Sequence, residues 1–197
     1  MHSHSNPFPL RARCSGLWAR FSAKFDDVLL QAPDADAPSM PSSDCPDVDG
    51  LLRALGALCL PGSPFVMASH PLAATAEQRA RQMVWLQHEL LRMDGTLHMQ
   101  QLGGRWRQRQ HRLAIKLREV MASPEAPPSG PWDCGLLKTD PAALNQAALF
   151  TPRRCTLMVA WEPTAHTLAS LIAILQQREA RFARPVRLWV LGGAVQA

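Results

Sequence analysis

The clearest alternation of hydrophobic and polar stretches lies near the end of the chain, over residues 153–192. An apolar run at Cys155–Trp161 ends at Glu162-Pro163, and a second apolar run at Val186–Leu191 is closed by two glycines. Between the runs, apolar residues recur every three or four positions, which is the spacing of one helix face. This pattern predicts a strand–helix–strand unit, whose two strands lie parallel in one sheet.

The helix of this unit is expected to begin at Thr164 or Thr167, since threonine can cap a helix. Its inner face consists of Leu168, Leu171, Ile172 and Leu175. Together with Trp161 and Trp189 of the strands, we expect Leu171, Ile172 and Leu175 to form the interface between the helix and the sheet.

The first half of the chain has a similar pattern. Asp47 or Asp49 can cap a helix whose leucines share one face and which Pro61-Gly62 ends. The short apolar run at residues 64–69 then predicts a strand.

A second helix is expected over residues 75–93, with Thr75 and Gln78 forming a capping box. We expect another strand over 96–102, because a turn precedes this run and two glycines follow it. The first half would then be a second strand–helix–strand unit.

Residues 105–121 predict a basic helix with Leu113, Leu117, Val120 and Met121 facing inward. Residues 123–131 are rich in proline and form a flexible connection. A short helix follows over 142–150, with Asp140-Pro141 as its cap and first-turn proline.

These elements predict a small α/β domain with an open, mostly parallel sheet of about four strands and helices on its faces. The domain is expected over residues 50–193, with sub-units at 50–122 and 132–193. Residues 1–49 are expected to be a disordered or weakly helical charged leader and linker.

Charge is distributed unevenly in the predicted leader, although the net charge of the whole chain is +5. Residues 1–25 contain four basic residues and no acidic one, whereas residues 26–50 contain seven aspartates and no basic residue. Three interpretations of residues 10–30 remain open: a helix packed on the domain, a helix on a membrane surface, and a cleaved organelle presequence. Residues 31–46 are expected to be a linker, because proline, aspartate and serine dominate them.

Several function classes lack their sequence signals. No apolar stretch reaches the roughly 18–20 residues that a membrane span needs. The five cysteines have no metal-ligand or redox spacing. No glycine-rich phosphate loop or known catalytic motif is present. The sequence therefore predicts no cofactor and no metal, and a protein of the reducing cytoplasm that is either free or peripheral to a membrane.

Ligands of parallel sheets bind where the strands end at their carboxyl edge. If both units share one sheet, the two strand ends offer His70 and, in the other loop, Glu162 and His166. A histidine and a carboxylate that meet there could serve as a base and its orienting partner. The alternative is that Glu162 favours the helix dipole and both histidines are ordinary surface residues.

Two weaker signals complete the candidate chemistry. Cys134 follows a proline-rich approach, but no general base for a nucleophile is identifiable. His2 and His4 are separated by one residue, a spacing that weakly indicates metal binding.

The densest positive charge surrounds Trp106. It consists of Arg105, Arg107, Arg109, Arg112, Lys116 and Arg118. Four of these share a helix face, and no glutamate four residues ahead pairs with them. Such a face can bind nucleic-acid phosphates or membrane headgroups, although a solvated helix face has the same pattern.

A set of residues in the last third of the chain resembles a known pattern. The matching positions are Asp133, Gly135, Leu137, Pro152, Arg153, Leu157 to Ala160, Thr167, Leu168, Leu171, Ile172, Arg187, Trp189, Val190 and Leu191. Residues 132–192 are thereby similar to the C-terminal soluble segment of a bacterial membrane-associated family that is known as a domain of unknown function and is often found beside a predicted GTPase. The membrane spans that precede this segment in the family have no counterpart here. The resemblance implies no catalytic residues.

The sequence therefore favours a non-catalytic α/β interaction domain that binds a protein partner or an anionic surface through its basic helix. One alternative is a hydrolase or transferase with an active site at the strand ends. Another is a nucleic-acid-binding protein.

Overall fold

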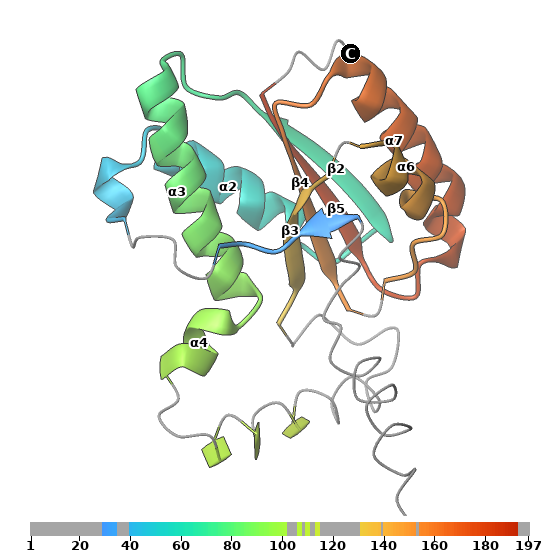
Figure 1. Cartoon of the computed structure of the whole chain (residues 1–197), viewed down its shortest axis with the longest axis horizontal. Coiled ribbons are helices and arrows are strands. Elements are labelled where there is room, and N and C mark those ends of the chain that lie inside the picture. The colour runs from blue at the N-terminus through green and yellow to red at the C-terminus, as the bar shows by residue number, and fades with distance from the viewer. Residues whose placement is uncertain are drawn as a thin grey trace, which may run out of the picture.

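The computed structural model describes residues 29–34, 40–101, 106–107, 109–110, 113–114, 131–138, 140–152 and 154–192. The strands are β1 (Leu30–Gln31), β2 (Phe65–His70), β3 (Asp133–Leu137), β4 (Thr156–Trp161) and β5 (Val186–Leu191). The helices are α2 (Val48–Leu58), α3 (Ala76–Met93), α4 (Thr96–Gln101), α6 (Pro141–Ala147) and α7 (Ala165–Arg178), with 3₁₀ turns η1 (Ser42–Asp44) and η2 (Glu179–Arg181). They form one sheet between two helical layers (Figure 1).

The sheet has the order β1-β3-β4-β5-β2. Strands β3, β4, β5 and β2 are parallel, and β1 pairs antiparallel with β3. The predicted α/β class with a mostly parallel sheet is confirmed. The sheet holds one more strand than expected, because β1 comes from the predicted linker.

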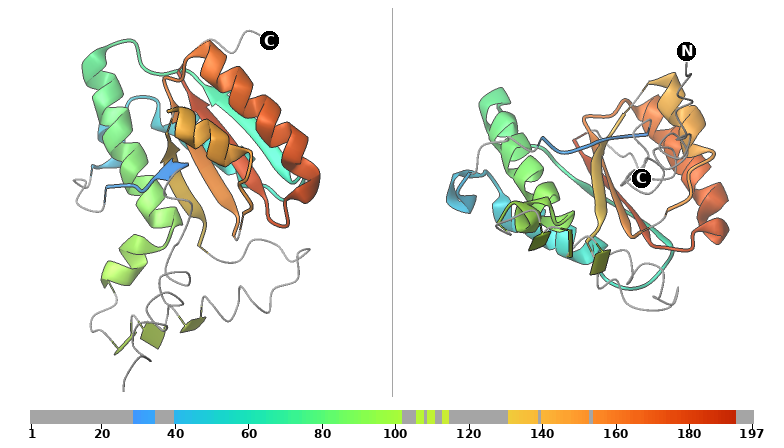
Figure 2. Two further views of the ribbon diagram at one scale, coloured as in Figure 1. Left: turned by 45° about the vertical axis from the view of Figure 1, so that its right-hand side comes forward. Right: turned by 60° about the horizontal axis from the view of Figure 1, so that its bottom comes forward.

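The helices cover the sheet on both faces, as the two views of Figure 2 show. Helices α2 and α3 pack on one face with Leu157, Val159 and Trp189. Helices α6 and α7 pack on the other face against side chains such as Met158 and Leu188. Strands β4 and β5 are thus buried on both faces, which explains why their sequences are continuous apolar runs rather than alternating ones.

The predicted interface is confirmed for the helix residues, whereas the two tryptophans lie on the opposite face of the sheet, with α2 and α3. Leu171, Leu175 and Trp189 are fully buried. Trp161 and Ile172 are partly buried and pack against the two apolar clusters.

Side-chain caps fix the starts of three helices. The hydroxyls of Thr75 and Thr164 accept the backbone N–H of Gln78 and Thr167, and the carboxylate of Asp140 accepts that of Ala143. Each oxygen satisfies one of the donors that a helix start leaves unpaired. The predicted caps Thr75 and Asp140 are therefore confirmed, and Thr164 rather than Thr167 caps α7.

Two element predictions are wrong. Residues 96–102 do not form a strand: Thr96–Gln101 is helix α4. The strand that follows β2 in the chain is β3, at Asp133–Leu137, on the far side of β4 and β5. Its five residues include Gly135 and the polar Asp133, so the hydrophobic pattern did not reveal it.

Part of the predicted leader belongs to the domain. Leu29 and Leu30 are buried in the cluster beneath α6 and α7. Cys45 is buried beside α2 and α3. The boundary at residue 50 is therefore wrong, because residues 29–31 and 40–49 contribute to the sheet and the core. Residues 1–28 and 35–39 lie outside the described part of the chain.

A buried arginine of β5 forms hydrogen bonds with the end of α2 and the turn that follows it. The Arg187 side chain projects from β5 and is 1% exposed. Its guanidinium donates hydrogen bonds to the carbonyls of Leu58, Leu60 and Ser63, at the end of α2 and in the turn after it. These carbonyls lie at or beyond the end of α2, where no further N–H of the helix is available, so the arginine supplies a donor to each.

Replacing Leu171 by Ala tests the packing of α7 on the sheet. Because Leu171 is fully buried, the loss of its side chain should lower the free energy of unfolding by about 2–5 kcal/mol in a urea titration. Leu149→Ala is the matched control, since Leu149 is 71% exposed. A similar loss in both variants would contradict the assigned core.

Candidate functional site

The connections at the carboxyl edge of the sheet diverge on either side of β5. The loop after β2 leads to α3 on one face, and the loop after β4 leads to α7 on the other. His70, Leu191 and Trp161 are in register, so the three strands end level. A divergence of this kind is the position at which open α/β sheets bind ligands.

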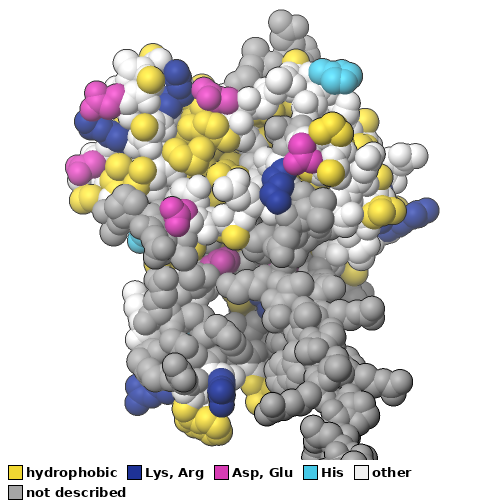
Figure 3. Space-filling model, in the orientation of Figure 1, with side chains coloured by type: hydrophobic (Ala, Val, Ile, Leu, Met, Phe, Trp, Pro, Cys, Tyr) yellow, Lys and Arg dark blue, Asp and Glu magenta, His cyan; other side chains and the backbone are white. Residues whose placement is uncertain are grey.

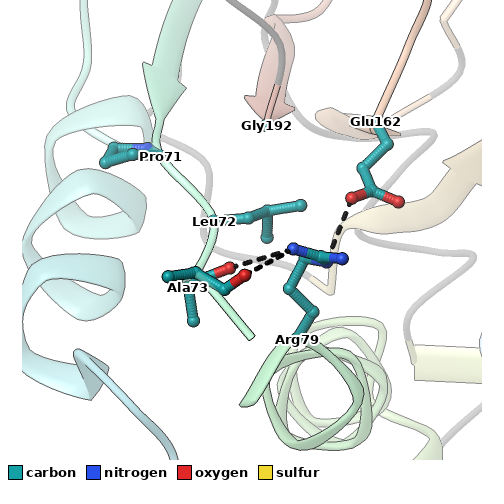
Figure 4. Close-up of a pocket in the computed structure, with 7 residues that line it drawn as sticks. Pro71, Leu72, Ala73, Arg79, Glu162 and Gly192 are labelled. Atoms are coloured by element: carbon teal, nitrogen blue, oxygen red, sulfur yellow. Dashed lines mark hydrogen bonds and ion pairs between the residues drawn. The ribbon is translucent and has the colours of Figure 1, made fainter. Parts of the chain in front are cut away.

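An open hollow of about 460 Å³ lies at this position. Its lining comes from three segments that are far apart in the sequence: Pro71, Leu72, Ala73, Ala74, Arg79, Glu162 and Gly192. Figure 4 shows Arg79 and Glu162 pointing toward each other across it. The volume lies in the range of small-molecule sites, and polar and apolar atoms contribute about equally to the exposed lining.

Arg79 is held in place by the loop that it follows. Its Nη1 donates to the carbonyls of Ala74, at 3.0 Å, and Ala73, at 3.4 Å. The buried amide of Gln82 supports the same loop, because its Oε1 accepts the backbone N–H of Ala73 and its Nε2 donates to the carbonyl of Pro46. The guanidinium therefore occupies a defined position beside the first turn of α3.

Glu162 pairs with Arg79 through a single contact. The distance from Arg79 Nε to Glu162 Oε1 is 3.2 Å, and the two side chains are 34% and 52% exposed. Water screens such an ion pair, which is worth at most about 1 kcal/mol. The pair is loose enough to be replaced by a ligand.

The backbone at the hollow is unusual at two positions. Glu162 has a φ of 44° and Gly192 a φ of 73°. This left-handed conformation costs a residue with a side chain about 1–2 kcal/mol, whereas glycine adopts it freely. A Cβ at Gly192 would lie 2.7 Å from Leu72 Cδ1, so a larger residue would intrude on the hollow.

The three strand-end residues predicted from the sequence separate in the structure. Glu162 lines the hollow. His70 instead lies 2.9 Å from the Asp47 carboxylate through its Nε2, at the start of α2. His166 lies exposed in the first turn of α7. The constellation of a histidine base with Glu162 is therefore not assembled, and the predicted catalytic role of these residues gains no support.

The sequence analysis missed Arg79, Leu72 and Gly192 as site residues. An arginine four positions into a helix that follows a strand was an available signal, but nothing in the sequence placed β2 next to β5. Without that neighbour relation, Arg79 and Glu162 cannot be assigned to one site.

The basic segment is described only in part. Trp106, Arg107, Arg109, Gln110, Leu113 and Ala114 are helical and exposed. Arg105, Arg112, Lys116 and Arg118 lie outside the described residues. Leu113 was predicted to face inward and is 59% exposed, and Trp106 is 68% exposed, so neither packs on the sheet.

Burial makes the cysteines poor nucleophiles. Burial, followed by the nearby carboxylates of Asp94 and Asp133, raises the pKa of the Cys134 thiol well above its ordinary value. Burial also raises the pKa of Cys45 to about 11, with a smaller contribution from Asp47. A thiol that stays protonated at neutral pH is inert, so Cys134 is a core residue.

The described residues contain no group of three or more metal-ligating side chains. No helix among them is long and apolar enough to cross a membrane. No family model, curated protein or solved structure matches this chain.

The raised thiol pKa values predict alkaline destabilisation. Between the ordinary thiol pKa of 9.0 and the value of about 11 in the folded protein, the unfolded chain releases a proton that folded Cys45 retains. The free energy of unfolding should therefore fall as pH rises above about 9, by up to about 1.4 kcal/mol per pH unit for each such thiol. The chain has no tyrosine to obscure this titration.

Urea titrations from pH 8 to 11 measure the effect. Cys45→Ala should reduce the pH dependence, whereas Val48→Ala, a packing change beside it, should leave the dependence unaltered. A stability that is constant across this range would show that the thiols do not titrate as described.

Proposed function

We propose that this chain is a non-catalytic α/β interaction domain that binds an anionic membrane surface through residues 105–118. The observation that carries the proposal is the exposure of Trp106 and Leu113 beside the exposed Arg107 and Arg109. An aromatic ring, an aliphatic side chain and two cations, all exposed and close together in the chain, suit the boundary between lipid headgroups and acyl chains.

The position of this segment in the fold supports the same conclusion. Trp106 and Leu113 lie between α4 and β3 in the chain, and neither is part of the two apolar clusters of the sheet. In Figure 3, hydrophobic and basic side chains gather next to each other at the lower end of the described surface, below α4.

The resemblance of residues 132–192 to a membrane-associated family is consistent with this proposal. We propose that the two are related, and that the protein lies in the cytoplasm at the periphery of a membrane.

Vesicle co-sedimentation tests the proposal directly. Arg107→Glu/Arg109→Glu should weaken binding to phosphatidylglycerol-containing vesicles at least about tenfold at low salt, because each basic residue near an anionic surface contributes about 1 kcal/mol. Trp106→Ala/Leu113→Ala should weaken binding by removing the apolar contact. Neither pair should lower the melting temperature, since all four side chains are exposed.

Arg53→Glu/Arg81→Glu is the matched control. It changes the net charge equally at two arginines of α2 and α3. An equal loss of vesicle binding in this control would mean that only the overall charge matters and would contradict the proposal. Binding to duplex DNA in place of vesicles would assign the segment to nucleic acid, and binding to neither would favour a protein partner.

A further inference from the structure

We infer that the hollow at the carboxyl end of β5 is a binding site for a small carboxylate, which Arg79 binds and for which Glu162 substitutes in the free protein. The inference goes beyond the proposed surface binding, because it concerns different elements and a different class of ligand. Its evidence is the geometry of Arg79, the single contact and strained backbone of Glu162, and the apolar side chains of the loop that lines the hollow.

Arg79 is prepared for a ligand before the ligand binds. The carbonyls of Ala73 and Ala74 take up Nη1 of its guanidinium. This leaves the edge that carries Nε and Nη2, which is an edge that a carboxylate can bind with two parallel hydrogen bonds. A guanidinium that is already fixed loses less side-chain freedom when a ligand binds.

Glu162 shows that this edge of the Arg79 guanidinium binds a carboxylate. Its carboxylate makes only one contact with the guanidinium, at 3.2 Å from Nε, and about half of its side chain is exposed. The residue is also held in a left-handed backbone conformation that a glycine would adopt without cost. Backbone strain of this kind concentrates at functional sites. A free carboxylate could make the second contact and return Glu162 to water.

The walls define the rest of the ligand. Apolar side chains of Pro71, Leu72, Ala73 and Ala74 line part of the hollow, and Gly192 lies against Leu72. A Cβ at position 192 would meet both Leu72 and Glu162. Apart from Arg79 and Glu162 the lining contains no charged side chain. The ligand is therefore a carboxylic acid with a short apolar body, which is either a free acid or the C-terminus of a peptide.

The start of α3 also favours an anionic ligand in the hollow. Thr75 caps this helix of 18 residues, directly after the loop that lines the hollow. The positive end of the helix dipole lies nearby and favours an anion over a neutral ligand.

Two-dimensional amide NMR of the full chain tests the inference with defined probes. Butyrate, hexanoate and benzoate are each compared with their primary amides, and an acetylated dipeptide with a free C-terminus is compared with its amidated form. We expect saturable shifts at the backbone amides of Ala73, Ala74 and Gly192 with the acids and none with the amides. Tighter binding of the dipeptide than of hexanoate would identify a peptide C-terminus as the source, and the reverse would identify a free acid.

Two variants act in opposite directions. Arg79→Gln should abolish the shifts. Glu162→Gln should tighten binding up to about fivefold, because the ligand no longer competes with an internal carboxylate. The exposed pair of Glu77 and Arg81 in the same helix supplies the controls. Glu77→Gln and Arg81→Gln make the same charge changes away from the hollow and should leave binding unaltered.

Tighter binding of the acids by Glu162→Gln tests the inference even if Arg79→Gln fails to fold. The inference is overturned if none of the acids gives saturable shifts, if acids and amides behave alike, or if Glu162→Gln binds no more tightly than the unmodified protein. It is also overturned if Glu77→Gln tightens binding equally.

Discussion

The burial of Arg187 within the sheet domain is the constraint on which the rest of the structure depends. Within the described part of the chain its guanidinium pairs with no carboxylate, and all of its hydrogen bonds go to main-chain carbonyls. Burial lowers the pKa of this guanidinium below its ordinary value. Removing a charge from water is costly, so the arginine can be buried only while the end of α2 supplies those carbonyls. Strand β5 and α2 are therefore stable only together.

The other end of α2 contacts the carboxyl end of strand β2. Helix α2 ends over Arg187, and before its first residue lies Asp47, whose carboxylate contacts His70 at the end of β2. A Cβ at Gly50 would lie 2.5 Å from the Asp47 carboxylate, so a larger residue there would require this carboxylate to shift. The loop after His70 then forms one wall of the hollow. The placement of α2 thus helps to determine where β2 and its loop lie relative to β4 and β5.

The sequence predicted local structure well and the relations between distant segments poorly. The strands at 156–161 and 186–191 and the helix between them follow from apolar runs and helical spacing. The caps at Thr75 and Asp140 follow from the chemistry of helix starts. In contrast, β3 is short and contains a glycine, and the two-residue β1 is held by pairing with β3 and by the burial of Leu30. The partnership of β2 with β5 joins residues more than a hundred positions apart, and no local pattern carries that information. For the same reason Glu162 was predicted as a site residue but Arg79, its partner, was not.

Unfolding of Arg187→Met, followed by urea titration and amide hydrogen exchange, tests the central claim most directly. Without the guanidinium the carbonyls of Leu58, Leu60 and Ser63 lose their donor. The variant should therefore lose about 3 kcal/mol or more of unfolding free energy, and α2 should exchange faster than α7. Arg53→Met, on the exposed side of α2, should change little. Stability of Arg187→Met within about 0.5 kcal/mol of the unmodified protein, or equal acceleration of exchange in α2 and α7, would contradict the account.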